Sequence, residues 1–546
     1  MTRIPQNISE TKFDVIVVGA GVNGCGIARD AAMRGLRVLL LDKSDVAAGT
    51  TAWSTRLIHG GLRYLEHGEF GLVRESLRER ETLLRRVAPH LVRPLPVLAP
   101  LYAGRRRGRL TIRAGMLAYD LLSPGKSLPR HRMLSAAEAL ARAPGLEREG
   151  LKGAALFYDA QVEYAERLAV ENALSARGRG AMVITHARVR RLLVEENRAR
   201  GVEFEDAPGG PAHEARAGVV LNVAGPWVDE VLGGAAGSGG RLIGGTKGSH
   251  LVVRGFEGAP AAAVYTEAVE DGRPFFVVPW DEKFLIGTTD ERYAGDLERV
   301  EASGDEVEYL LREANRVLPR ARLTRAEVLY TYSGVRPLPY VGGGEEAAVT
   351  RRHFIKPSRV AGLYSIVGGK LTTYRALAEE AVDLVFKLRG ETPPPCETAA
   401  APLPGAAAEG FASRDSDSFR ESLALRSGLA PRSAARLLKV YGSRAAEVAR
   451  LASDEPELLE VISEETGSVA AEVVYAFREE FAETLADCLL RRTMVGLNGR
   501  LGLDALDTAA RVARRFLGWD EERAASEVES YRRYVERFRP KEGAGF

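Results

Sequence analysis

The sequence predicts an α/β fold in which a Rossmann-like nucleotide-binding domain is interleaved with a mainly antiparallel substrate-binding sheet and followed by an α-helical C-terminal domain. Three observations lead to this prediction. Residues 13–41 have the pattern of a strand, a glycine turn, a helix and a second strand. Residues 249–287 contain short alternating segments typical of antiparallel strands. Beyond residue 413 the chain is rich in Ala, Leu, Arg and Glu at helical spacing.

Length and charge exclude some classes of protein. The 546 residues are several times the ~150 of a single domain, so more than one structural unit and a sizeable core are expected. The 76 basic and 74 acidic residues leave a net charge of +2, which gives no electrostatic argument for a nucleic-acid partner. Only 11 of the basic residues are lysines, so a lysine inside a motif is a better candidate for a chemical role than an ordinary arginine.

Cysteine usage and hydropathy narrow the choice of cofactor and of cellular compartment. Cys25, Cys396 and Cys488 lie far apart with no C-x-x-C pair, which argues against structural zinc, an iron–sulfur cluster and a disulfide framework. We therefore expect no metal site and a cytoplasmic location. The N-terminus does not resemble a signal peptide, and no segment reaches the ~20 apolar residues of a spanning helix, so any membrane association is expected to be peripheral.

The N-terminal segment carries a dinucleotide-binding fingerprint. Gly19, Gly21 and Gly24 follow a β-branched apolar run and open a helical stretch over 25–34. Such glycines allow a tight turn, close approach of the backbone to a pyrophosphate and helix-to-strand packing, and a helix N-terminus favours an anion. A second apolar strand over 37–41 ends in Asp42, which we expect to accept hydrogen bonds from the adenosine ribose.

The residues after Asp42 favour FAD over a nicotinamide cofactor. Segments 47–56 and 57–65 are rich in small and polar residues, whereas nicotinamide enzymes of this fold usually proceed directly to a third strand. Flavin enzymes commonly run such a segment along their extended cofactor. The sequence therefore predicts an FAD site.

Two further N-terminal segments have a surface character. A charged helix is predicted over 69–87. The segment over 95–123 is interpreted as an amphipathic surface hairpin or helix, or alternatively as a docking face for anionic lipid. The second interpretation rests on its arginines, which are Arg105, Arg106, Arg107, Arg109 and Arg113.

The remaining patterns give the domain organisation. Strands are predicted over 180–190, 202–204 and 217–227, and residues 362–373 repeat the order of strand, double glycine and helix. A proline-rich stretch indicates a linker. We predict interleaved FAD and substrate domains over 12–392 (FAD parts 12–90, 155–230 and 355–390; substrate parts 91–154 and 231–354), a linker over 393–412 and a helical domain over 413–546.

Eight motifs, taken in order, are recognisable. They are GAGVNGCGIARDAAMRG, STRLIHGGLRYLEHGEF, NVAGPW, GTKGSHLVV, VVPW, IGTTD, TYSGVRPLP and GGKLTTYR. The chain resembles the FAD-dependent glycerol-3-phosphate dehydrogenases of the aerobic, respiratory type over residues 14 to about 389, with a weaker helical match beyond. The resemblance implies oxidation of sn-glycerol 3-phosphate to dihydroxyacetone phosphate, with electrons passed from FAD to a membrane quinone. We further expect a peripheral position on the inner face of the cell membrane, with an anionic lipid surface as a partner, and leave a homodimer open.

Five residues within these motifs look like the family's substrate-binding positions. Arg63 and Tyr64 stand in HGGLRY, Arg336 in SGVRP, Lys370 after the double glycine, and Thr288 in GTTD. Arg63, Arg336 and Lys370 are expected to hold phosphate and oxygen atoms, because a phosphate requires fixed cations. Lys370 alternatively lies near flavin N1 and the C2 oxygen, where its charge would stabilise the reduced flavin.

The catalytic group is predicted to comprise Arg336, Lys370 and two histidines. His250 and His59 are the candidates for the general base, since an imidazole titrates near neutral pH. We favour His250 as the base, with His59 helping to position the isoalloxazine. Either histidine could instead be a hydrogen-bonded structural residue.

The predicted cofactor-binding positions come from the same motifs and the fingerprint. They are Gly19, Gly21, Asn23, Gly24, Asp42, Lys43, Thr51, Ser54, Thr55, Leu57, Gly60, Gly61, Val189, Gly225, Gly369, Lys370, Leu371 and Thr372. Arg56 departs from the pattern, because some family members carry Lys there, so no specific role is assigned to it. Lys247 also lies inside a motif.

Other functions remain as alternatives. A glycerol-3-phosphate oxidase would pass electrons to O₂ and form hydrogen peroxide, and no large insertion separates the motifs to favour it. An anaerobic relative with an iron–sulfur partner is disfavoured by the missing cysteine cluster, and the GVRPLP and GGKLTTYR pair argues against amino-acid oxidation. A non-enzymatic flavoprotein with structural FAD is disfavoured by the basic pocket residues.

Overall fold

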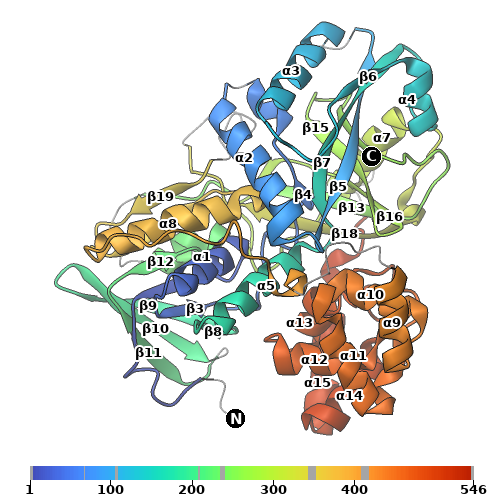
Figure 1. The fold of residues 1–546 in the computed structure, drawn as a ribbon. Helices are drawn as coiled ribbons and strands as arrows, with labels where there is room; N and C mark the ends of the chain where they lie inside the picture. The colour runs from blue at the N-terminus through green and yellow to red at the C-terminus, as the bar shows by residue number, and fades with distance from the viewer. Residues whose placement is uncertain are drawn as a thin grey trace.

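The computed structural model describes residues 4–66, 68–104, 108–206, 209–233, 240–341, 352–407 and 417–542. Figure 1 shows three parts: a sheet with α8 at the left, a second large sheet at the upper right, and a helical domain at the lower right. The predicted α/β class with a helical C-terminal domain is confirmed. Of the arginines proposed to face lipid, 105–107 lie outside the described residues.

The first sheet has the predicted nucleotide-binding topology. All its neighbouring strands pair in parallel except β19 with β20. Such strands are buried on both faces, which explains their runs of Val, Ile and Leu. The order is β19 (Phe354–Pro357), β20 (Leu363–Val367), β12 (Val220–Asn222), β2 (Val15–Val18), β3 (Val38–Leu41) and β8 (Met182–Ile184).

Three helices form one buried core with this sheet. They are α1 (Val22–Met33), α5 (Ala165–Gly178) and α8 (Tyr374–Leu388), and α1 packs against the other two. Val17, Ala28, Leu168 and Val382 from β2, α1, α5 and α8 belong to the same apolar cluster. The helix predicted over 25–34 is thus present and begins three residues earlier.

A four-stranded sheet extends this part of the molecule. Its order is β1 (Lys12–Phe13), β11 (Ala212–Ala217), β10 (Arg198–Asp206) and β9 (Ala187–Glu195). Since β9 follows β8 after only two residues, His186 and Ala187 lie directly beyond the carboxyl end of a parallel strand.

The second large sheet is mainly antiparallel, as predicted, with one parallel pairing between β14 and β5. Strand β18 (Val328–Arg336) pairs with β13, and β6 (Arg132–Leu134) pairs with β7. The remaining order is β17 (Glu291–Arg292), β13 (Thr246–Val253), β16 (Lys283–Gly287), β15 (Pro274–Trp280), β14 (Ala263–Glu267), β5 (Val92–Tyr102), β7 (Leu151–Val162) and β4 (Leu57–Ile58).

Helices cover this sheet, and the arrangement corrects the prediction made for segment 95–123. They are α2 (Phe70–Thr82), with a π-helical turn at Leu83–Val87, α3 (Arg109–Leu121), α4 (Ala136–Arg142) and α7 (Gly304–Val317). The segment 95–123 was expected to form one surface unit, but β5 lies inside the sheet and only α3 is largely exposed. The strand alternates poorly because both of its faces are covered: Val97 and Ala99 pack into one apolar cluster and Leu98 into another.

The C-terminal domain is helical and contains one small hairpin, β21 (Val461–Ser463) and β22 (Ser468–Val469), which is too short to show a strand pattern. Among the residues that the structure describes, no helix has the length and hydropathy needed to cross a bilayer. The helices are α9 (Asp417–Ser427), α10 (Pro431–Tyr441), α11 (Ala445–Asp454), α12 (Ala470–Glu479), α13 (Leu485–Asp487), α14 (Leu506–Leu517) and α15 (Glu521–Val535).

The predicted linker lies against the rest of the protein where it is described. The Leu403 side chain is fully buried, and its backbone N–H donates to the Val87 carbonyl at 2.8 Å. Arg29 Nη2 on α1 donates to the Ala401 carbonyl at 2.7 Å. Residues 408–412 of the linker lie outside the described part.

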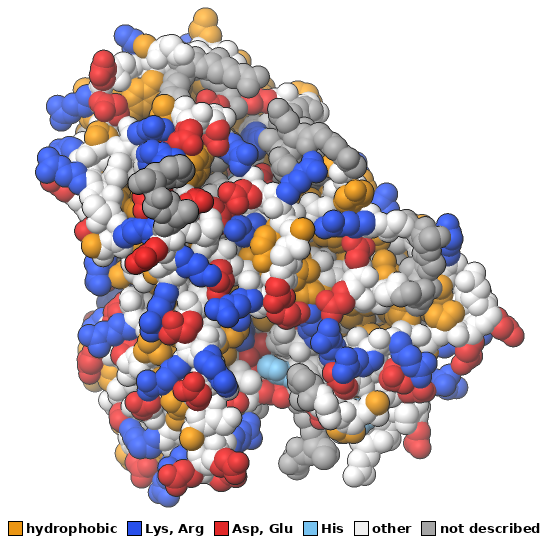
Figure 2. All heavy atoms as spheres, turned by 180° about the vertical axis from the view of Figure 1, so that it is seen from behind, with side chains coloured by type: hydrophobic (Ala, Val, Ile, Leu, Met, Phe, Trp, Pro, Cys, Tyr) orange, Lys and Arg blue, Asp and Glu red, His pale blue; other side chains and the backbone are white. Residues whose placement is uncertain are grey.

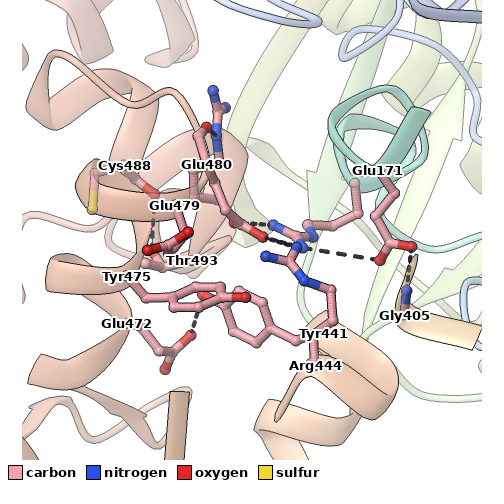
Figure 3. Close-up of polar contacts among 12 residues, drawn as sticks. Glu171, Gly405, Tyr441, Arg444, Glu472, Tyr475, Glu479, Glu480, Cys488 and Thr493 are labelled. Atoms are coloured by element: carbon pink, nitrogen blue, oxygen red, sulfur yellow. Dashed lines mark hydrogen bonds and ion pairs between the residues drawn. The ribbon is translucent and has the colours of Figure 1, made fainter. Parts of the chain in front are cut away.

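Buried ion pairs join the C-terminal domain to α5 (Figure 3). Glu480 accepts hydrogen bonds from Arg167 Nη2 on α5 at 2.8 Å and from Arg444 Nη1 at 2.7 Å. Glu171, also on α5, accepts from the Gly405 backbone N–H at 2.9 Å. Because a buried charge is costly unless it is paired, these contacts fix how the two parts meet.

The surface carries both signs of charge. On the face shown in Figure 2, Lys and Arg side chains are interspersed with Asp and Glu side chains. This agrees with the net charge of +2, and no broad basic field dominates that face.

Candidate active site

A cavity of about 720 Å³ opens at the carboxyl ends of the parallel strands. Residues that follow β2, β3, β12 and β20 line it, as ligand sites in open α/β sheets commonly do. The antiparallel sheet contributes a second wall through His250 and Arg336, and the C-terminal domain contributes a third through Asp487 and Tyr534.

The glycine turn between β2 and α1 is built for close backbone packing. Gly19 has a φ of +112°, and a Cβ there would lie 2.6 Å from the Val223 carbonyl oxygen. A Cβ on Gly24 would lie 1.8 Å from the Gly19 carbonyl oxygen. Asp42 holds the turn, since its Oδ2 accepts from the Ala20 N–H at 2.6 Å. The fingerprint glycines therefore place the N-terminus of α1 against the cavity.

The register of three strands brings His250 and Arg336 together. On β13, His250 lies opposite Gly287 of β16 and Tyr332 of β18, and Thr246 lies opposite Arg336. A Cβ on Gly287 would lie 2.6 Å from the His250 ring, so only glycine leaves room for the imidazole.

His250 is buried and neutral. Its Nε2 forms a 2.9 Å hydrogen bond with Thr55 Oγ1, and its Nδ1 has no hydrogen-bond partner among the described residues. Burial and the positive charges of Arg336 and Arg56 lower the pKa of His250 to about 3. The ring is therefore neutral at neutral pH, and any proton that it accepts enters a poorly hydrated site.

His59 also lines the cavity, beside the double-glycine turn. Its backbone N–H donates to Thr372 Oγ1 at 3.1 Å, and burial with the charge of Lys370 lowers the pKa of His59 to about 4. The hydrogen bond ties the segment after β4 to the segment after β20.

Arg336 is held in one orientation at the end of β18. Its Nη1 donates to Asp290 Oδ1 at 3.0 Å, and its Nη2 donates to Thr288 Oγ1 at 2.9 Å and to the Thr289 carbonyl at 3.2 Å. Thr288 does not line the cavity, so it supports Arg336 from behind. Its predicted contact with the substrate stays a prediction.

Lys370 precedes the short helical turn Leu371–Thr373 and reaches back to α2. Its Nζ donates to Ser76 Oγ at 2.9 Å and lies 4.7 Å from the centroid of the Tyr64 ring. Burial lowers the pKa of Lys370 to about 8. Tyr64 lines the cavity, whereas its neighbour Arg63 does not.

Comparisons with known proteins identify the family. Residues 14–384 match the model described as FAD dependent oxidoreductase, and residues 396–524 match the C-terminal domain of alpha-glycerophosphate oxidase. A protein named glycerol-3-phosphate dehydrogenase from Synechocystis sp. is 46% identical over 98% of each chain. The glycerol-3-phosphate dehydrogenase from Mycobacterium leprae is 38% identical over 96% of this chain and 88% of its own. The chain belongs to the FAD-dependent glycerol-3-phosphate dehydrogenase family.

A solved structure of a family member supports the same assignment. The glycerol-3-phosphate dehydrogenase from Bacillus halodurans, complexed with FAD, superposes with a TM-score of 0.80 at 28% identity, covering 99% of this chain and 98% of that one. The structure of L-alpha-glycerophosphate oxidase from Mycoplasma pneumoniae, at 19% identity and a TM-score of 0.57, shares the fold. FAD is the cofactor of this glycerol-3-phosphate dehydrogenase family member.

The cavity suits an extended dinucleotide. Asn23 Oδ1, in the first turn of α1, is buried and has no hydrogen-bond partner among the described residues. A Cβ on Gly369 would lie 2.8 Å from Asn23 Nδ2, so the two glycine turns approach each other closely. These observations fit FAD, whose pyrophosphate is favoured at a helix N-terminus.

Most of the predicted cofactor positions of this family member line the cavity. The exceptions are Gly24, Gly60 and Gly61, which do not. Those that do are Gly19, Gly21, Asn23, Asp42, Lys43, Thr51, Ser54, Thr55, Leu57, Val189, Gly225, Gly369, Lys370, Leu371 and Thr372.

Arg56 and Lys247 have structural partners. Arg56 is buried and donates from Nη1 and Nη2 to the two oxygens of Glu166, each at 2.7 Å. The planar guanidinium group matches the two carboxylate oxygens of Glu166, which explains why an arginine fits at this position. Lys247 Nζ pairs with Glu306 at 2.7 Å and does not line the cavity.

One supporting network was missed by the sequence analysis. Tyr119 on α3 accepts a hydrogen bond from the Gly60 N–H at 2.9 Å and donates to Asp159, which also pairs with Arg80 at 2.8 Å. These buried groups hold the loop that contains His59. No local motif marks them, because they come from three separate elements.

Proposed function

We propose that the protein oxidises sn-glycerol 3-phosphate to dihydroxyacetone phosphate and passes the electrons to a membrane quinone. The observation that carries the proposal is the convergence of Arg336, Lys370 and His250 on the cavity that suits FAD. The dehydrogenase names of the two relatives described above support it.

The two cations suit a phosphorylated alcohol. Asp290 and Thr288 orient the Arg336 guanidinium, which would bind phosphate oxygens with charge-assisted hydrogen bonds. Lys370, with a pKa of about 8, is mostly protonated at pH 7 and would hold a substrate oxygen or stabilise negative charge on the reduced cofactor. Arg63 is kept as a proposed contributor, although its side chain does not line the cavity.

The two histidines would share the proton and positioning tasks. Oxidation of a secondary alcohol removes a hydride from C2 and a proton from the hydroxyl group. FAD supplies the hydride acceptor, N5, when it is bound. If His250 donates from Nε2 to Thr55, its Nδ1 keeps a lone pair for the hydroxyl proton. His59 would help to position the isoalloxazine.

The substrate and the acceptor are testable on one purified holoenzyme. Under anaerobic conditions the flavin absorbance should bleach with sn-glycerol 3-phosphate and stay unchanged with glycerol or an amino acid, because the cations select for phosphate. Re-oxidation should then be faster with a quinone analogue than with O₂. Absence of bleaching would reject the substrate.

A glycerol-3-phosphate oxidase is the second candidate. It is favoured by one observation, the match of residues 396–524 to a domain described from alpha-glycerophosphate oxidase. Stoichiometric hydrogen peroxide, formed as fast as the quinone analogue is reduced, would establish the oxidase and replace the quinone proposal.

Attachment to the inner face of the cell membrane is part of the proposal, and α3 is the surface that supports it. Leu110, Leu117 and Leu121 on α3 are 80%, 50% and 80% exposed, and Arg109 and Arg113 stand beside them. An apolar face flanked by arginines suits an anionic lipid surface.

Replacing Leu110 and Leu121 together by serine should reduce co-sedimentation with phosphatidylglycerol vesicles several-fold, because it removes apolar area from the contact. A matched control is the double replacement of Val194 and Leu388, exposed residues of β9 and α8, by serine. Equal binding of the α3 variant and the unmodified protein would reject α3 as the contact.

A further inference from the structure

The end of the cavity near Asp42 is closed by a cluster of charged side chains from three parts of the chain. Asp45 follows β3, His186 connects β8 to β9, and Asp487 and Arg491 belong to the C-terminal domain. Asp487 Oδ2 lies 2.9 Å from His186 Nε2, and all four residues line the cavity.

Arg491 binds both carboxylates and still keeps a free donor. Its Nε donates to Asp45 Oδ2 and its Nη2 to Asp487 Oδ1, each at 2.6 Å. Its side chain is nine-tenths or more buried, and its Nη1 has no hydrogen-bond partner among the residues that the structure describes. A buried donor without a partner costs free energy, so this arrangement calls for an acceptor inside the cavity.

The neighbouring Arg492 differs in this respect. It donates to Asp45 from Nη1 at 2.9 Å and from Nη2 at 2.6 Å, and its Nε donates to the Glu480 carbonyl. It does not line the cavity. Arg492 therefore serves the contact between the two domains, whereas Arg491 serves that contact and also faces the cavity.

We propose that Arg491 binds the adenosine half of FAD, so that the C-terminal domain completes the cofactor site. Asp42 fixes which end of the cofactor lies here, because the acid after the second strand of such a sheet lies next to the adenosine ribose. Ribose hydroxyls and adenine ring nitrogens are acceptors for the Nη1 proton. The contact joins the C-terminal domain to a cofactor site whose predicted positions all lie within the first 372 residues.

The test uses apoprotein titrated with flavins and followed by flavin fluorescence. Arg491→Met should weaken FAD binding about 10- to 100-fold, the range for losing a hydrogen bond to a charged group. FMN, which lacks adenosine, should bind as it does to the unmodified protein. ADP, which carries adenosine without a flavin and is measured by its competition with FAD, should lose affinity by the same factor as FAD.

Arg492→Met is the matched control, since it removes a guanidinium from the same carboxylate outside the cavity. It should change the affinities for FAD and FMN by the same factor. An unchanged FAD affinity in Arg491→Met, or an equal loss for FAD and FMN, would overturn the proposal.

A second variant guards against misfolding. Arg491→Lys keeps a positive charge beside Asp45 and Asp487 but lacks the guanidinium fork, so it should weaken FAD and ADP selectively and keep the thermal unfolding midpoint of the apoprotein. Equal weakening of FMN in this variant would also overturn the proposal. No substrate enters these titrations, so their outcome is independent of the activity proposed above.

Discussion

Replacing His250 by asparagine should lower the rate of flavin reduction by sn-glycerol 3-phosphate about 10²- to 10⁴-fold, the usual contribution of a general base. Asparagine can still hydrogen-bond to Thr55 Oγ1, which lies 2.9 Å from the imidazole, but it cannot accept the hydroxyl proton. Stopped-flow absorbance under anaerobic conditions measures this rate. His213→Asn, on β11 and outside the cavity, is the matched control and should keep the full rate.

The pH profile adds a second readout for His250. Because burial and two arginines lower its pKa to about 3, the imidazole is neutral and able to accept a proton at every pH above about 4. Protonation would remove the base only below that pH, so flavin reduction should show no loss centred near pH 6.5. A normal rate in His250→Asn, or a loss centred at pH 6.5 that this variant abolishes, would contradict the assignment.

Replacing Arg336 by alanine should lower kcat/KM for sn-glycerol 3-phosphate about 10²- to 10³-fold, as expected for removing a charge-assisted contact to a phosphate. The content of bound FAD should stay near that of the unmodified protein, because the predicted cofactor cradle lies at the parallel sheet. Steady-state kinetics and the ratio of flavin to protein absorbance measure the two quantities.

Arg254→Ala is the control for Arg336→Ala. Arg254 follows β13, is exposed and does not line the cavity, so its loss should leave kcat/KM unchanged. A parallel loss of FAD and activity in Arg336→Ala would mean that Arg336 binds the cofactor instead of the substrate.

Local pattern was sufficient for the parts of the fold built from consecutive residues. The glycine turn, the strands on either side of it and the helix after it were predicted because each uses neighbouring residues with a defined period. The same is true of the double-glycine turn at Gly368 and Gly369, where a strand ends and Lys370 begins the next turn. The antiparallel sheet was predicted as a class, but not its strand order.

The contribution of the C-terminal domain to the cavity could not be predicted from local sequence patterns. Arg491 reaches Asp45 across 446 positions in the sequence, and no spacing rule connects residues so far apart. One signal was present, a pair of adjacent arginines inside the apolar run 485–497, since charges in such a run must be paired when buried. The predictions for Arg63 and Thr288 rested on motif position, which fixes the neighbourhood of a side chain but not the direction in which it points.

The ion pairs between the domains also determine when, during synthesis, the protein can finish folding. Arg167 and Asp45 are synthesised early, whereas their partners Glu480 and Arg492 lie 313 and 447 positions later. Until those partners leave the ribosome, a guanidinium and a carboxylate destined for burial have to stay in water. The early domains therefore cannot reach their final packing during most of translation, and the joining of the last helices is the step that closes the molecule.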